Sequence, residues 1–167
     1  MIPEGNKIER IGSIDDIIRR MAYQIVESNS DFDKVVIAGI ASNGFAFAEK
    51  LHQVLKDIST CQFTVMEVVI DKKNPLRSIK TSVPINDIKD VPVVIVDDVL
   101  NSGSTLIHAV KYFLQIPLAQ IQTAVIVNRN HKRFPIKADF KGISFSTSMK
   151  EHIQVVLEGP NQGIYLS

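Results

Sequence analysis

Two adjacent carboxylates, Asp97 and Asp98, are the side chains in this sequence whose type and spacing best suit chemistry. They directly follow the apolar, β-branched run 93–96, which is typical of a strand buried on both faces. Small polar residues occupy positions 101–105, and apolar residues then recur at helical spacing. The N–H groups at a helix start bind phosphate, whereas carboxylates bind sugar hydroxyls or a hydrated Mg²⁺ ion. The stretch 93–105 therefore predicts a site for a phosphorylated sugar.

A second short polar loop follows the β-branched run 35–40. Helical spacing resumes at Phe45, so the loop lies between a strand and a helix and is a second candidate anion site. A tight turn with nearby glycines needs no ligand, and both interpretations stay open. The four residues of the loop are Ala41, Ser42, Asn43 and Gly44.

The segment 71–83 follows another apolar run, 63–70, and has little periodicity. It carries several cations, among them Lys72, Lys73 and Arg77. A solvated basic loop would explain this composition, and so would a flap that closes on an anion. Long loops without structure are uncommon unless they are functional or disordered, which favours the flap.

The remaining pattern predicts an α/β fold with a central, largely parallel sheet and flanking helices. A helix is expected to begin at a Ser13–Asp16 capping box and to end near residues 28–30. Further helices are expected from Phe45 and from residue 106 to Pro117, with a strand at 121–127. The short apolar pieces after residue 136 are predicted to be strands at the edge of the same sheet. We expect residues 1–167 to form one domain.

This topology predicts where the polar loops meet. In sheets of parallel strands, ligands bind beyond the carboxyl ends of the strands. All the loops singled out above follow a strand, as does the basic segment 128–133, so they are expected to gather at one edge. A nucleotide-hydrolase magnesium site is excluded because the sequence has no G-x-x-x-x-G-K-[ST] loop.

Composition restricts the class of protein further. The formal net charge is +1, which argues against a protein dominated by nucleic-acid or membrane electrostatics. No apolar stretch approaches the roughly 20 residues of a membrane span, and the N-terminus lacks the apolar core of a signal peptide. The single cysteine, Cys61, is expected to be a buried and inert thiol. A cytoplasmic location is expected.

The stretch 93–105 resembles the signature of the type I phosphoribosyltransferases, which bind phosphoribosyl pyrophosphate (PRPP). The resemblance implies that Asp97 and Asp98 bind the ribose hydroxyls and order Mg²⁺ through water. It implies that the 5-phosphate is bound by the loop of Asn101, Ser102, Gly103, Ser104 and Thr105. By the same resemblance, residues 41–44 form the pyrophosphate loop and residues 71–83 the flexible loop that closes over the site.

Within this family the sequence is most similar to the pyrimidine-operon attenuator proteins that also act as uracil phosphoribosyltransferases. The similarity is carried by D-D-V-L at 97–100 and by the segment 130–140. It implies that Phe140 stacks on the base near Lys141, that the substrates are PRPP and a nucleobase, and that the chain forms a homodimer or homotetramer. Departures occur at the pyrophosphate loop, at Asp71-Lys72-Lys73, and at Asn101 and Ser104.

The sequence supports two hypotheses for the function of the protein. The first is an enzyme that joins a pyrimidine-like base to the phosphoribosyl group. Asn101 disfavours a 6-oxopurine, because an amide cannot act as the general base that hypoxanthine-type enzymes place there. The second is a nucleotide-sensing protein that binds RNA, although the net charge makes this weaker. Its candidate cations are Arg10, Arg19, Arg20, Lys132 and Lys137, and His131 is a further candidate near the base.

Overall fold

A six-stranded sheet forms the centre of the computed structural model, which describes residues 3, 5–8, 12–146 and 151–167. The strand order is β4-β3-β2-β5-β6-β7, and all neighbours except β3 and β4 run parallel. The strands are β2 (Lys34–Ile40), β3 (Gln62–Val69), β4 (Lys80–Thr81), β5 (Val93–Leu100), β6 (Ile121–Arg129) and β7 (Phe140–Phe145). The predicted α/β fold with a largely parallel sheet is confirmed.

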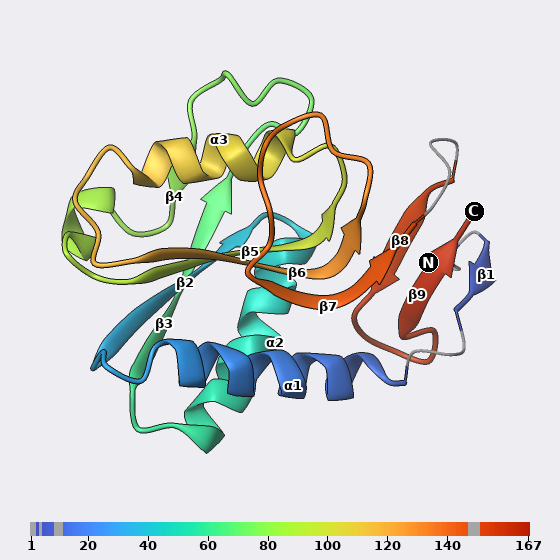
Figure 1. The fold of residues 1–167 in the computed structure, drawn as a ribbon, viewed down its shortest axis with the longest axis horizontal. Helices are drawn as coiled ribbons and strands as arrows, with labels where there is room; N and C mark the ends of the chain where they lie inside the picture. The colour runs from blue at the N-terminus through green and yellow to red at the C-terminus, as the bar shows by residue number, and fades with distance from the viewer. Residues whose placement is uncertain (1–2, 4, 9–11, 147–150) are drawn as a thin grey trace.

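Helices cover both faces of this sheet (Figure 1). On one face, α1 (Ile14–Ser28) and α2 (Asn43–Ile58) pack an apolar core against the strands. On the other face, α3 (Ser104–Phe113) and the short 3₁₀ helix η2 (Ile85–Ile88) form a second core. The continuous apolar runs of β2 and β5 are explained by this arrangement, since a central parallel strand is buried on both faces.

The helix boundaries follow from local chemistry. Ser13 caps α1 as predicted: its Oγ accepts from the Asp16 backbone N–H at 3.1 Å and donates to Asp16 Oδ2 at 2.7 Å. Helix α2 begins at Asn43, two residues before the predicted start, so it includes half of the predicted polar loop. Helix α3 ends at Phe113, ahead of Pro117.

The C-terminal strands correct one prediction. Strand β7 joins the edge of the main sheet as expected, but β8 (Ile153–Val156) and β9 (Gly163–Leu166) do not. They pair with each other and with β1 (Asn6–Lys7) in a separate antiparallel sheet of order β1-β9-β8. Apolar patterning indicates that a segment is a strand but not which sheet it joins. Figure 1 shows this small sheet beside β7.

Two smaller expectations also need correction. The segment 71–83 is not without structure, because β4 within it pairs with the end of β3. Cys61 is half-buried, whereas we expected it to be buried. Its burial, and to a smaller extent the nearby charge of Asp33, raise the pKa of its thiol. Among the described residues, no helix has the length and apolar character needed to cross a membrane.

Candidate functional site

A cavity of about 220 Å³ opens at the carboxyl end of β5, where the sequence predicted the ligand to lie. The loop after β5 and the start of α3 form one wall, and the small sheet forms the opposite wall through β8. Asn43 reaches it from the start of α2, and Lys72 reaches it from the loop that follows β3. The full lining is Asn43, Lys72, residues 97–106, Val125 and residues 152–155.

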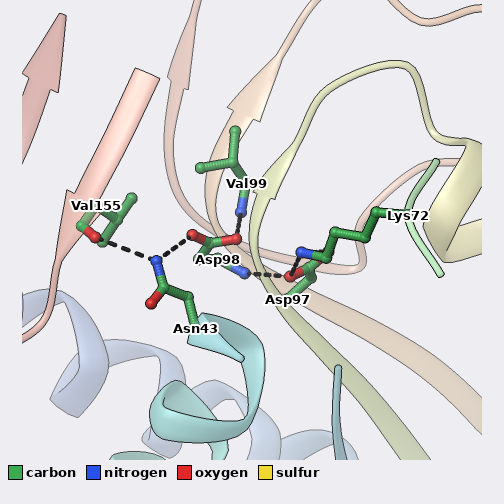
Figure 2. A network of polar contacts seen from close by, with 6 residues as sticks. All are labelled: Asn43, Lys72, Asp97, Asp98, Val99 and Val155. Atoms are coloured by element: carbon green, nitrogen blue, oxygen red, sulfur yellow. Dashed lines mark hydrogen bonds and ion pairs between the residues drawn. The ribbon is translucent and has the colours of Figure 1, made fainter. Parts of the chain in front are cut away.

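Asp97 is the most buried carboxylate of the site, at 5% exposure. Burial, and next the adjacent charge of Asp98, raise the pKa of Asp97 to about 7. Lys72 acts in the opposite direction, because its Nζ lies 3.1 Å from Oδ1 and 3.5 Å from Oδ2 of Asp97. Figure 2 shows Lys72 extended across the site toward this carboxylate. A cation at this position is therefore part of the electrostatics of the site.

Asp98 is held by donors from two directions. Its Oδ1 accepts from the backbone N–H of Val99 at 2.9 Å, and its Oδ2 accepts from Asn43 Nδ2 at 2.9 Å. The same Nδ2 donates to the carbonyl of Val155 at 3.4 Å, so Asn43 links the acid to strand β8 (Figure 2). The side chain at the start of α2 thus positions a carboxylate on β5.

The loop 101–105 makes a tight turn into helix α3. Gly103 has a φ of +86°, and a Cβ there would lie 2.7 Å from Cγ2 of Ile136, so the tight approach requires glycine. Ser104 N–H donates to Ser102 Oγ at 3.3 Å. Thr105 lies in the first turn of α3, where backbone N–H groups have no partner within the helix, and it lines the cavity. A helix start of this kind can bind an anion.

The predicted pyrophosphate loop lies beside the acids, although only part of it lines the cavity. Asn43 does so, and Gly44 packs against β5 so closely that a Cβ would lie 2.9 Å from the Asp97 Cα. The peptide bond between Ala41 and Ser42 is cis, and the Ala41 N–H donates to the carbonyl of Val68. Ala41 and Ser42 themselves are outside the lining of the cavity.

The predicted flexible loop reaches the cavity through Lys72 alone. Asp71 organises a turn: its Oδ1 accepts from the N–H groups of Lys73 and Asn74, and its Oδ2 pairs with Arg77 at 3.1 Å. Lys73 is exposed, and 71% of the Arg77 side chain is exposed. Neither of these two side chains lines the cavity.

The structure does not bring the predicted base-stacking residue to the cavity. Phe140 is 7% exposed and packs in the core between the sheet and helices α1 and α2, while Lys141 is exposed. Strand β8 and the residue before it line the cavity instead, through residues 152–155. Sequence reasoning missed these residues because their apolar pattern signals a strand and gives no sign of a ligand.

A second cavity adjoins the first. Its lining includes Asn101 and Ser102, which also line the main cavity, together with Arg129, His131, Lys132 and Arg133. Arg129 Nη1 donates to Asn101 Oδ1 at 3.0 Å. Burial, and then the nearby Lys141 and Lys137, lower the pKa of Lys132. The basic segment thus lies against the loop 101–105, as the topology predicted.

The donor set suits Mg²⁺ only if the ion also uses oxygens from a substrate and from water. Among the described residues, no cluster of three or more His, Cys, Asp or Glu side chains could hold a metal ion. Asp97 and Asp98 supply the hard oxygen ligands that Mg²⁺ prefers, and Mg²⁺ is commonly bound by one or two carboxylates plus substrate phosphates. The ammonium of Lys72 already shows that a cation fits against Asp97.

Comparison with known proteins identifies the class to which this site belongs. The model of the phosphoribosyl transferase domain family matches residues 4–158, so the chain belongs to the phosphoribosyltransferase family. The solved hypoxanthine phosphoribosyltransferase of Trypanosoma cruzi has the same fold, with a TM-score of 0.72 over 86% of this chain and 82% of that one, at 17% identity.

Two bacterial proteins that share one name are more similar to this chain in sequence. The chain is 32% identical over 154 residues to the bifunctional protein PyrR of Streptococcus thermophilus, covering 86% of this chain and 88% of that protein. It is 36% identical over 149 residues to the bifunctional protein PyrR of Fusobacterium nucleatum, covering 84% of each chain. The family resemblance predicted from the sequence is confirmed.

Proposed function

We propose that this protein transfers the 5-phosphoribosyl group of PRPP to a pyrimidine-like base and releases pyrophosphate. The observation that supports this most is the position of Asp97 and Asp98 at the end of β5, in one cavity with the start of α3. A phosphate at the first turn of α3 would place the ribose of PRPP next to these acids. The family membership of the chain supports the same class of reaction.

The residues have separate roles in this proposal. The first-turn N–H groups of α3 anchor the 5-phosphate. Asp97 and Asp98 hold the ribose hydroxyls and stabilise the positive charge that develops on the sugar as the bond to pyrophosphate breaks. Mg²⁺, when bound beside these carboxylates, neutralises charge on the pyrophosphate. Asn43 keeps Asp98 oriented. The loop 41–44, with Lys72, Lys73 or Arg77 closing over it, would hold the leaving pyrophosphate.

The base is assigned from two observations. The relatives at 32% and 36% identity are named PyrR, whereas the purine enzyme with a similar structure shares only 17% identity and thus shares the fold alone. Asn101 supplies an amide at the entrance of the cavity, and an amide cannot exchange a proton with a purine ring nitrogen. The wall against the base is then formed by β8, with His152 and Ile153, in place of Phe140.

Pyrophosphate release tests this proposal. The protein is mixed with Mg²⁺, PRPP and each free base in turn, and pyrophosphate is measured over time. We expect release with uracil and not with hypoxanthine. Asp98→Asn, which keeps the shape but removes the charge, should lower kcat/KM by about 10²-fold, the usual scale for loss of one electrostatic group. Normal turnover by this variant would contradict the assignment of the acids.

A regulator that binds RNA is a second candidate, favoured by the closeness of Lys132, Lys137 and Lys141. Burial, and then the charges of Lys141 and Lys137, lower the pKa of Lys132. The other predicted cations contribute less. Arg20 donates to the backbone carbonyls of Lys141 and Gly142, Arg19 lies over the ring of Tyr23, and Arg10 lies outside the described residues. Binding of a pyrimidine leader RNA that weakens steeply with salt would support this function. Absence of binding at low salt would exclude it.

We also propose that the chain forms a homodimer or homotetramer. Several large apolar side chains are exposed, including Leu76 at 81% and Leu114 at 60%. Where such side chains form a contiguous patch, another subunit frequently covers it. Sedimentation velocity over a range of concentrations would show a dimer or tetramer, and a monomer at all concentrations would contradict this part of the proposal.

A further inference from the structure

The ammonium of Lys72 lies where a bound cation would be expected in the proposed active site. Its Nζ is within 3.5 Å of both carboxylate oxygens of Asp97. Among the described residues, the pair of Lys72 and Asp97 is the only ion pair that involves either Asp97 or Asp98. A side chain of the protein itself therefore acts as a counter-ion to Asp97.

The backbone around Lys72 is organised so that this side chain is presented to the site. Asp71 accepts from the N–H groups of the two residues after Lys72 and pairs with Arg77. These contacts close a turn directly after β3, at the same sheet edge as Asp97. The side chain of Lys73, the next residue, is exposed and lies outside the cavity. The contact is thus specific to one of two adjacent lysines.

The Lys72 side chain can also move away from Asp97. It is 44% exposed, whereas the Asp97 side chain is 7% exposed, so the lysine reaches into the cavity from solvent. A divalent cation and an ammonium group compete for one carboxylate, because two positive charges at such a distance repel each other. Removal of Lys72 leaves a buried carboxylate without its counter-ion, and such a charge favours another cation strongly.

We propose that Lys72 is a resident counter-ion of the site, which holds Asp97 in the ligand-free protein and must be displaced before a divalent cation binds there. This inference rests on the proposed function, since it concerns the cation that accompanies PRPP. In this account Lys72 is a positioning residue: it keeps the Asp97 carboxylate in place and sets the metal concentration at which the site is loaded.

Binding of Mn²⁺ alone tests this role, because free Mn²⁺ is measured directly by electron paramagnetic resonance. We expect Lys72→Met to bind Mn²⁺ about tenfold or more tightly than the wild type, as loss of a competing charge at this distance predicts. Lys72→Arg, which keeps the charge, and Lys73→Met, which removes an adjacent one, should both bind like the wild type. Adding Asp97→Asn to Lys72→Met should abolish the gain.

Several results would overturn the proposal. Equal affinity of the wild type and Lys72→Met for Mn²⁺ would do so, whether both proteins bind or neither does. An equal gain in Lys73→Met would show a general effect of net charge instead. Circular dichroism of each variant verifies folding. Failure of the proposed function would give a different result from failure of this inference. In that case neither the wild type nor Lys72→Met would bind PRPP with Mg²⁺ in a calorimeter, whatever the result with Mn²⁺ alone.

Discussion

Asp97 is surrounded by groups that oppose its ionisation as well as by one that favours it. Burial and the neighbouring Asp98 raise its pKa to about 7, and the ion pair with Lys72 offsets only part of this effect. An ionised carboxylate in such surroundings destabilises the folded protein. A ligand that pairs with this carboxylate offsets part of the destabilisation. Perturbed carboxylates of this kind are frequent at functional sites.

The free energy of unfolding should therefore depend on the protonation of Asp97. Its pKa in the folded protein, about 7, is above the ordinary value of 3.8, so the folded state binds the proton more tightly than the unfolded state. Stability from this group is complete below pH 3.8 and is lost as the pH rises to about 7, by up to about 4 kcal/mol. Urea unfolding between pH 4 and pH 8, without metal, measures this loss.

Comparison with Asp97→Asn isolates this contribution, because all other carboxylates titrate in both proteins. We expect the difference in stability between the variant and the wild type to grow in favour of the variant across this range. A difference that stays constant with pH would show that the pKa of Asp97 is not raised.

At the scale of elements, the contact between α2 and β5 decides where the acids lie. Gly44 is in the first turn of α2, and a Cβ at this position would lie 2.8 Å from the carbonyl oxygen of Val96 and 3.0 Å from Asp97 Oδ1. The absence of a side chain lets the helix start touch the strand that carries the acids. It also brings Asn43 within 2.9 Å of Asp98.

Gly44→Ala is consequently expected to destabilise the protein, although glycine to alanine in a helix usually stabilises it by about 0.5–1 kcal/mol. Overpacking against β5 should cost about 1–3 kcal/mol and should weaken PRPP binding, because Asp97 must shift. Urea unfolding and calorimetry measure the two effects. Glu49→Ala, an exposed change in the same helix, is the control and should leave both unchanged. A Gly44→Ala protein as stable as the wild type would contradict the close contact.

Most elements could be predicted from the sequence, since their patterns are local. The apolar run before Asp97, the Ser13 cap and the helix after residue 103 depend on neighbouring residues only. Two features depend on residues distant in the chain. The placement of β8 on the cavity wall requires pairing with β9, and the contact between Lys72 and Asp97 requires the loop after β3 to meet strand β5. The burial of Phe140 in the core could not be predicted either, because the pattern of β7 does not say which face covers the core.

At the scale of the whole molecule, the cavity lies between two sheets of different construction. The parallel sheet supplies the acids and the phosphate loop, and the small antiparallel sheet supplies the facing wall. Ile153 and Val155 of β8 belong to the same apolar core as α1 and α2, so the wall is fixed to the rest of the protein. Asn43 joins the two sides through Asp98 and the Val155 carbonyl. A ligand bound between these two sheets is therefore expected to lie in a rigid site.

Binding of PRPP tests the central claim most directly, because the ligand follows from the geometry with fewer steps than the acceptor base does. Isothermal titration calorimetry with Mg²⁺ present should show PRPP binding to the wild type. Asp98→Asn should bind at least about tenfold more weakly, equivalent to about 1.4 kcal/mol. Asn86→Ala, an exposed change in η2 away from the cavity, should bind like the wild type. No binding by the wild type, or equal binding by Asp98→Asn, would contradict the account.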